Sequence, residues 1–170
     1  MSAPAHRKDA PASVRCFILT ISDSRTEAND ASGDAIAELL ASAGHEIVGR
    51  RIVRDEPSMV RDVVARVNDG PTERKPDVVI TTGGTGITTR DSTYEAIASM
   101  FEKRLDGFGE LFRMLSYAEI GAAAMLTRAA AGTIGRVAIF LLPGSEHAVR
   151  LALAKLILPE IGHVVRELRR

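Results

Sequence analysis

Residues 77–86 read DVVITTGGTG, a short apolar and β-branched run that leads directly into a glycine-rich turn. An apolar run without alternation is typical of a strand buried on both faces, as in a parallel sheet. Similar runs are VRCFILTI at 14–21 and RVAIFLL at 136–142, and EIVGRRIV at 46–53 is a further candidate strand. The sequence therefore predicts a mainly parallel sheet.

Between these runs, apolar residues recur at i, i+3, i+4 and i+7, which predicts amphipathic helices. The predicted helices begin after Asp30 or Ser32, at Pro57, after Ser92, at about residue 108 and after Ser145. Residues 120–132 are ambiguous, with a possible short strand before Gly132, and Pro159 is a candidate kink in the last helix.

Alternating strands and helices predict one α/β domain over residues 14–170, with three α/β/α layers and helices on both faces of the sheet. The strand order does not follow from the pattern. Residues 1–13 are rich in alanine and proline and lack a hydrophobic segment. We expect them to be a disordered tail and not a secretory signal.

The composition excludes several classes of protein. Among 170 residues, Lys and Arg number 22, as do Asp and Glu, so the formal charge is zero. The single cysteine, Cys16, rules out an internal disulfide and cysteine-based zinc sites, and it is expected in the core. No apolar run is long enough to span a membrane. We therefore expect a cytoplasmic protein without nucleic-acid or membrane partners.

Ligands of open parallel sheets bind beyond the carboxyl ends of the strands, so the residues that follow each strand are the candidate site. These residues are Ser22 and Asp23 after the first strand, Asp55 after the second, Thr82, Gly83, Gly84, Thr85 and Gly86 after the third, and Pro143, Gly144 and Ser145 after the last.

The glycine-rich turn favours an anion, because glycines let backbone N–H groups approach a phosphate closely. It is neither a P-loop nor a dinucleotide fingerprint, since the residues that complete those motifs are absent. The alternative is a tight structural turn. Arg25, Arg90 and Arg128 are candidate phosphate contacts or solvated surface arginines.

Asp55 and Asp91 lie in loops near this turn, where carboxylates can position Mg²⁺ beside a phosphate. Asp91 has an alternative role with Ser92 in capping the next helix, for which Ser92 and Glu95 have capping-box spacing. Ser145 is either a helix N-cap, an anion contact or both. A serine hydrolase built on Ser145 and His147 is disfavoured, because residues two apart on a helix do not face each other.

Six motifs together carry a family resemblance: SDSR at 22–25, TTGGTG at 81–86, RDSTYEA at 90–96, GFGELFRMLSYAEIG at 107–121, LTRAAAG at 126–132 and LPGS at 142–145. With these motifs, residues 14–168 resemble the molybdenum-cofactor biosynthesis MoaB/Mog family. The resemblance implies a molybdopterin-binding α/β domain that binds molybdopterin. In the Mog type it also implies adenylylation by Mg-ATP, with Mg²⁺ as cofactor and pyrophosphate as by-product.

By this resemblance, Gly83 to Gly86 match the loop for the pterin phosphate, with Thr82 before them, and Asp55 and Asp91 match the two functional aspartates. Ser22 and Asp23 match the first-strand motif, and Pro143 to Ser145 match the Pro-Gly-Ser segment. The resemblance also implies Asp91 as the Mg²⁺ ligand.

The resemblance also implies a homotrimer or hexamer and a separate downstream enzyme that inserts molybdate. Residues 107–121 resemble the MoaB branch, which keeps a second reading open: a molybdopterin carrier or scaffold without catalysis. A third reading is an unrelated phosphosugar or nucleotide enzyme that shares only the glycine turn.

Overall fold

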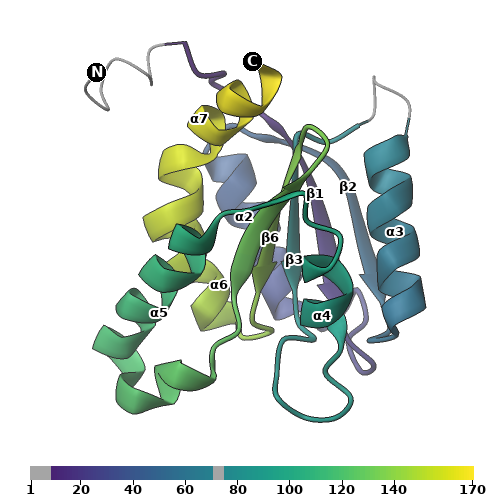
Figure 1. Cartoon of the computed structure of the whole chain (residues 1–170), viewed down its shortest axis with the longest axis vertical. Coiled ribbons are helices and arrows are strands. Elements are labelled where there is room, and N and C mark those ends of the chain that lie inside the picture. The colour runs from purple at the N-terminus through teal and green to yellow at the C-terminus, as the bar shows by residue number, and fades with distance from the viewer. Residues whose placement is uncertain (1–8, 71–74) are drawn as a thin grey trace.

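The computed structural model describes residues 9–70 and 75–170 and contains one six-stranded sheet (Figure 1). The strands, in their order across the sheet, are β2 (Glu46–Val53), β1 (Arg15–Ile21), β3 (Val78–Thr82), β6 (Val137–Leu142), β5 (Ala130–Ile134) and β4 (Lys103–Arg104). The first four strands are parallel, whereas β5 and β4 are antiparallel to their neighbours. The predicted three-layer α/β fold with a mainly parallel sheet is confirmed.

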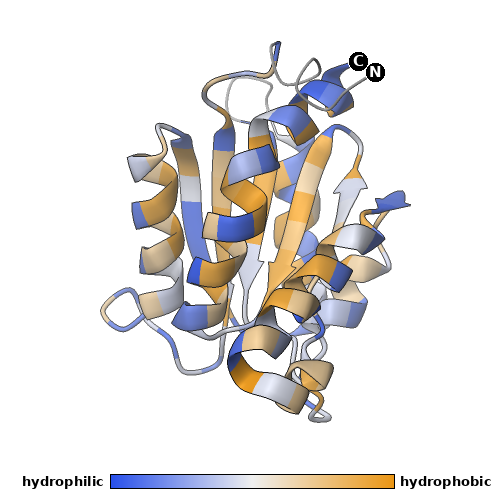
Figure 2. Cartoon of the chain, turned by 90° about the vertical axis from the view of Figure 1, so that its left-hand side faces the viewer, coloured by the Kyte–Doolittle hydropathy of each residue, from blue (hydrophilic) through white to orange (hydrophobic). Residues whose placement is uncertain are grey.

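Helices cover both faces of the sheet (Figure 1). They are α2 (Ala31–Ser42), α3 (Pro57–Asp69), α4 (Thr93–Ala98), α5 (Asp106–Ile120), α6 (Glu146–Ala152) and α7 (Leu158–Arg169), with a 3-10 turn η1 (Gly121–Leu126) and a π turn η2 (Leu153–Ile157). One core lies between the sheet and α2, α5, α6 and α7, and the other lies under α3 and α4. Figure 2 shows the central strands as a hydrophobic layer between helices of mixed character.

The central strands contribute side chains to both cores, as their continuous apolar runs predict. In β1, Cys16 and Ile18 face the first core, whereas Leu19 and Ile21 face the second. Cys16 is fully buried, and this burial raises the pKa of its thiol to about 12. The expected place of Cys16 in the core is therefore confirmed.

The sequence pattern is least informative for the two antiparallel strands, β5 and β4. The possible strand before Gly132 is β5, although alanine has a low preference for strands. The ring of Phe101 lies against the bare Gly132, where a Cβ atom would be 2.4 Å from Phe101 Cγ. Pairing with β6 and with the unpredicted two-residue strand β4 completes this part of the sheet. Tertiary contacts therefore decide the structure here.

The last helix carries a π turn immediately before Pro159. Proline lacks the N–H for a helical hydrogen bond and its ring clashes with the carbonyl four residues earlier, and a wider turn relieves both problems. The irregularity expected at Pro159 is therefore present as η2.

The chain before β1 is described only from residue 9, so residues 1–8 of the predicted tail lie outside the described residues. Residues 9–13 lie beside α7, which differs from the disorder expected for them. Asp9 Oδ2 is 3.4 Å from Arg166 Nη2, and a Cβ atom on Gly162 would be 2.7 Å from the carbonyl oxygen of Pro11. Within residues 9–70 and 75–170, no helix combines the length and apolar character needed to cross a bilayer.

A buried aspartate joins α2 to the sheet. Asp30 is the N-cap of α2 and is fully buried, and its carboxylate accepts from Gly33 N at 3.0 Å and from Arg50 Nη2 at 2.7 Å. Burial by itself raises the pKa of Asp30, but hydrogen bonds from Arg50, Thr20 and Gly33 outweigh it, so the pKa is lower than that of a free aspartate. The ionised form of Asp30 therefore stabilises the fold.

We expect Asp30→Ala to lower the free energy of unfolding by about 3 kcal/mol, because it removes a helix cap and leaves Arg50 without its buried partner. Urea denaturation measures this loss. Asp34→Ala is the matched control: Asp34 also binds Arg50, at 2.6 Å, but is 60% exposed. It should cost less than about 1 kcal/mol.

The contribution of Asp30 should be complete above the ordinary carboxyl pKa of about 4 and disappear as the pH falls through the lower pKa of the folded state. Equal losses for Asp30→Ala and Asp34→Ala would contradict this account of α2.

Candidate functional site

A cavity of about 670 Å³ lies beyond the carboxyl ends of the parallel strands. All twelve predicted site residues line it: Ser22, Asp23, Asp55, Thr82, Gly83, Gly84, Thr85, Gly86, Asp91, Pro143, Gly144 and Ser145. Residues that were not singled out as contacts also line it, including Thr20, Ser32 and Thr127. The topology therefore brings four separate loops to one place, as expected for the carboxyl edge of a parallel sheet.

The glycine-rich turn requires glycine at its first two positions. Gly83 has φ +99°, its N–H donates to Leu142 O at 3.1 Å, and a Cβ atom there would be 2.1 Å from Ile21 O. Gly84 has φ +64°, and a Cβ atom there would be 2.2 Å from Thr93 Oγ1. The turn therefore packs directly on the end of β1 and on α4.

Backbone donors remain available in this cavity. Among the residues that the structure describes, none accepts a hydrogen bond from the N–H of Gly84 or Thr85. On the opposite side, Ser145 caps α6, with Ala148 N donating to Ser145 Oγ at 3.2 Å. Gly144 and Ser145 line the cavity, and no described residue accepts a hydrogen bond from their N–H groups. Two loops thus line the cavity with backbone donors.

The two candidate carboxylates have different surroundings. Asp55 Oδ1 accepts from Thr93 Oγ1 at 3.0 Å and from Ser92 Oγ at 3.3 Å. Asp91 accepts from the hydroxyl and the N–H of Thr88. The Thr88 hydroxyl, followed by the N–H groups of Thr88 and Gly86, holds the pKa of Asp91 below its usual range against the effect of burial. Asp91 is therefore ionised at neutral pH.

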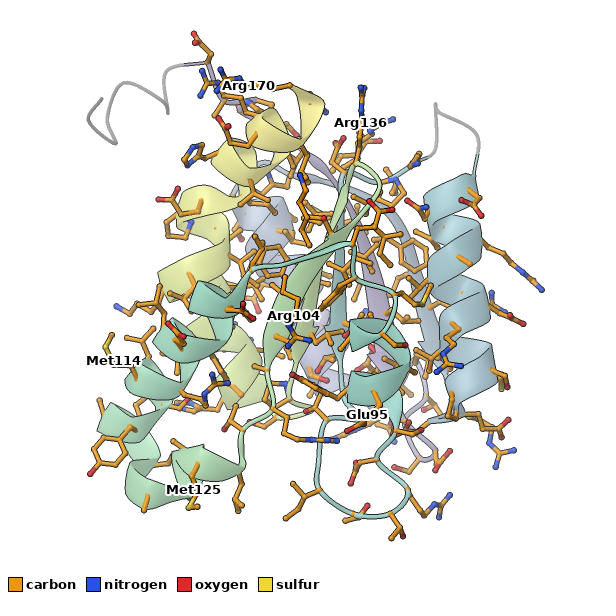
Figure 3. The ribbon with its side chains drawn as sticks, in the orientation of Figure 1. Glu95, Arg104, Met114, Met125, Arg136 and Arg170 are labelled. Carbon is orange, nitrogen blue, oxygen red and sulfur yellow. The ribbon has the colours of Figure 1, made fainter. Side chains whose placement is uncertain are left out.

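The capping box predicted for α4 is not formed. Ser92 occupies the N-cap position, but its hydroxyl makes no capping hydrogen bond and donates to Asp55 instead. Glu95 forms an ion pair with Arg128 and does not reach back to Ser92. Figure 3 shows Glu95 on the part of α4 nearest the glycine-rich loop. Hydrogen bonding with Asp55 and ion pairing with Arg128 therefore replace the capping contacts predicted for Ser92 and Glu95.

The arginines at the cavity hold loops together. Arg128 donates to the carbonyl oxygens of Thr85, at 3.0 Å, and Gly86, and its guanidinium lies 5.0 Å from the ring centre of Tyr94. Arg90 Nη2 is 2.7 Å from Asp23 Oδ2, and so connects the glycine-rich loop with the loop after β1. Arg25 donates to Asn29 O at 2.7 Å. Arg128 thus stabilises the glycine-rich loop by binding its carbonyl oxygens, a role that the spacing of residues in the sequence did not reveal.

The donor set has the oxygen chemistry that Mg²⁺ prefers. Asp55 and Asp91 contribute carboxylates to the same cavity, and Mg²⁺ is commonly bound by one or two carboxylates together with substrate phosphates and water. Within the described part of the chain, no group of three or more His, Cys, Asp or Glu side chains forms a complete metal site. Asp55 and Asp91 therefore fit a Mg²⁺ ion whose remaining ligands are phosphate oxygens and water.

Comparisons with known proteins agree with this picture. The family model described as "Probable molybdopterin binding domain" matches residues 17–163. A curated relative, molybdenum cofactor biosynthesis protein B of Bacillus cereus, is 53% identical over 171 residues, with 100% of this chain and 99% of the relative covered.

Two solved structures are similar. A crystal structure of a molybdenum cofactor biosynthesis protein B has a TM-score of 0.88 at 53% identity, covering 95% of this chain and 99% of the other. The tungsten cofactor synthesizing protein MoaB from Pyrococcus furiosus has a TM-score of 0.81 at 40% identity, covering 95% and 100%.

We expect Gly84→Ala to destabilise the protein more than Gly44→Ala does, by about 1 to 3 kcal/mol in urea denaturation. Both glycines have positive φ, but a Cβ atom on Gly44 would meet nothing within 4 Å, whereas one on Gly84 would clash with Thr93 and lie 2.8 Å from Asp55 Oδ2. Equal losses of stability in the two variants would contradict this prediction, because they would mean that Asp55 and Thr93 move aside at little cost.

Proposed function

This chain belongs to the molybdopterin-binding domain family, and on that premise we propose that it acts in molybdenum cofactor biosynthesis as a molybdopterin adenylyltransferase. The observation that carries the proposal is the meeting of free backbone donors and two carboxylates, Asp55 and Asp91, in one cavity at the sheet edge. The curated relatives, which are named for molybdenum cofactor biosynthesis, support the pathway.

In the proposed reaction, an oxygen of the terminal phosphate of molybdopterin attacks the α-phosphorus of ATP. A new P–O bond forms, the bond between the α-phosphorus and the bridging oxygen breaks, and pyrophosphate leaves with the electron pair. A phosphate is already ionised at neutral pH, so no strong base is needed. The protein must instead align two polyanions and reduce their repulsion.

The residues of the cavity divide these tasks. The N–H groups of Gly84 and Thr85, held by Arg128, would bind the phosphate of the pterin. Asp91 and Asp55 would hold Mg²⁺, which when bound supplies the positive charge that offsets the phosphate oxygens. Thr88 fixes the orientation of the Asp91 carboxylate through two hydrogen bonds to Oδ2.

A second function, molybdopterin binding without catalysis, is favoured by one observation. One carboxylate oxygen of Asp55 and one of Asp91 already accept hydrogen bonds from neighbouring residues, which leaves fewer oxygens for a metal. A carrier would use the donor-rich turn and need no metal. It would also deliver molybdopterin to the separate enzyme that inserts molybdate.

We also propose that the protein is a homo-oligomer, either a trimer or a hexamer. Phe108 and Phe112 of α5 are buried, whereas Leu111 beside them is 47% exposed. It belongs to an exposed apolar strip on α5 and η1 that consists of Leu111, Met114, Tyr117, Ile120, Met125 and Leu126. Figure 3 shows Met114 and Met125 at the outer edge of these two elements. Several large exposed apolar residues on neighbouring turns of a helix are typical of an interface.

Asp91→Asn should abolish the formation of adenylylated molybdopterin and pyrophosphate while leaving the fold and pterin binding intact, because only the charge is removed. The assay mixes protein, molybdopterin and Mg-ATP and follows both products. Asp62→Asn is the control, since Asp62 is exposed on α3 outside the cavity. Full turnover by Asp91→Asn would exclude the proposed role, and bound pterin without product in the wild type would identify the carrier.

Met114→Lys should convert the oligomer into smaller species in sedimentation experiments, because a charge in an apolar interface is costly to bury. Met59→Lys makes the same exchange at an exposed methionine of α3, outside the strip, and should leave the mass unchanged. A monomeric wild type would contradict the proposal.

A further inference from the structure

Two hydroxyl groups on the floor of the cavity donate to the carboxylate behind them, Thr20 at close range and Ser32 over a longer distance. Thr20 and Ser32 line the cavity and are 2% and 3% exposed. Thr20 Oγ1 donates to Asp30 Oδ2 at 2.7 Å, and Ser32 Oγ donates to Asp30 Oδ1 at 3.4 Å. Because a hydroxyl has a single proton, each group has only lone pairs left for a ligand.

The direction of these hydrogen bonds cannot reverse. Every partner of Asp30 is a donor, since Arg50 and Gly33 N also donate to its carboxylate. An ionised carboxylate accepts only, and these donors keep Asp30 ionised. Thr82 on the next strand behaves in the same way, because its hydroxyl donates to Pro143 O at 2.9 Å.

The cavity therefore has two chemically different walls. Its glycine-rich side presents N–H donors from Gly84 and Thr85, which suit phosphate oxygens. Its floor presents acceptors at Thr20 and Ser32, which suit N–H groups and oppose a carbonyl or phosphate oxygen. A ligand that satisfies both walls carries phosphate at one end and N–H donors at the other.

We propose that the floor is a subsite for the amino group of a fused heterocycle and that Asp30 is its positioning residue, acting through Thr20 and Ser32. The inference rests on the proposed function, in which both ligands carry such a group: the pterin ring and the adenine of ATP. The shared chemistry is an exocyclic amino group on a flat bicyclic ring. Its replacement by a carbonyl would set lone pair against lone pair.

Calorimetric titration of the full chain with two pairs of ligands tests this subsite by comparing their affinities. Pterin is compared with lumazine, and AMP with IMP, because in each pair a carbonyl replaces an amino group. The wild type should prefer the amino member of one pair by about tenfold, the effect of one hydrogen bond. The pair that shows the preference identifies which heterocycle occupies the floor.

Thr20→Val should reduce this preference to less than about twofold while leaving the affinity for inorganic pyrophosphate unchanged, because it removes one acceptor and keeps the shape. Thr81→Val is the matched control. Thr81 is fully buried on the neighbouring strand β3, and its hydroxyl has no partner among the described residues. Its replacement should keep the tenfold preference.

Asp30→Asn provides a second test of positioning. An amide keeps one acceptor oxygen but replaces the other with an NH₂ donor, so the hydroxyl of Thr20 or Ser32 loses its acceptor and is released to turn toward the cavity. The preference for the amino ligand should fall in a variant that still unfolds cooperatively in urea.

Equal affinities within both pairs in the wild type, or a full preference in Thr20→Val, would overturn the subsite. Either result would leave adenylyl transfer intact, because that reaction is measured by its own products. A wild type that discriminates between the ligands but makes no adenylylated product would instead reject adenylyl transfer and keep the subsite.

Discussion

The parallel alignment of three central strands is the constraint on which the site depends. Thr20 of β1 lies beside Thr82 of β3, and Thr82 lies beside Leu142 of β6. Because these positions are level, the loops that follow the strands leave the sheet at the same height. Gly83 then approaches Ile21 O so closely that a side chain would not fit. The cavity is therefore a direct product of strand register.

Charge is distributed in this region so that buried carboxylates are compensated and cavity carboxylates stay accessible. Asp30 lies under the floor and is neutralised by Arg50, whereas Asp55 and Asp91 are restrained mainly by hydroxyl and backbone donors. Arg128 binds carbonyl oxygens of the glycine-rich loop and Glu95. It thereby stabilises the loop that lines the cavity.

Much of the fold follows from the sequence, because long apolar runs and regular helical stripes depend on local periodicity. Eleven of the twelve candidate site residues follow strands whose ends must share an edge, which is why their meeting in one place could be predicted. Asp91 lies farther along the loop after β3, and it was the family resemblance that favoured a functional role for it over helix capping. The strand order, the short strand β4 and the network around Asp30 depend on contacts between distant segments. Ser92 and Glu95 show the same limit: their spacing suits a cap, but Asp55 and Arg128 compete successfully for both side chains.

The single thiol of the chain has a practical consequence. Cys16 is fully buried in the core between the sheet and the helices α2, α5, α6 and α7, and with a pKa of about 12 it has almost no thiolate at neutral pH. A thiol reagent can therefore reach it only when this helix layer opens away from the sheet. The rate of its modification therefore reports how often the core beneath these helices opens.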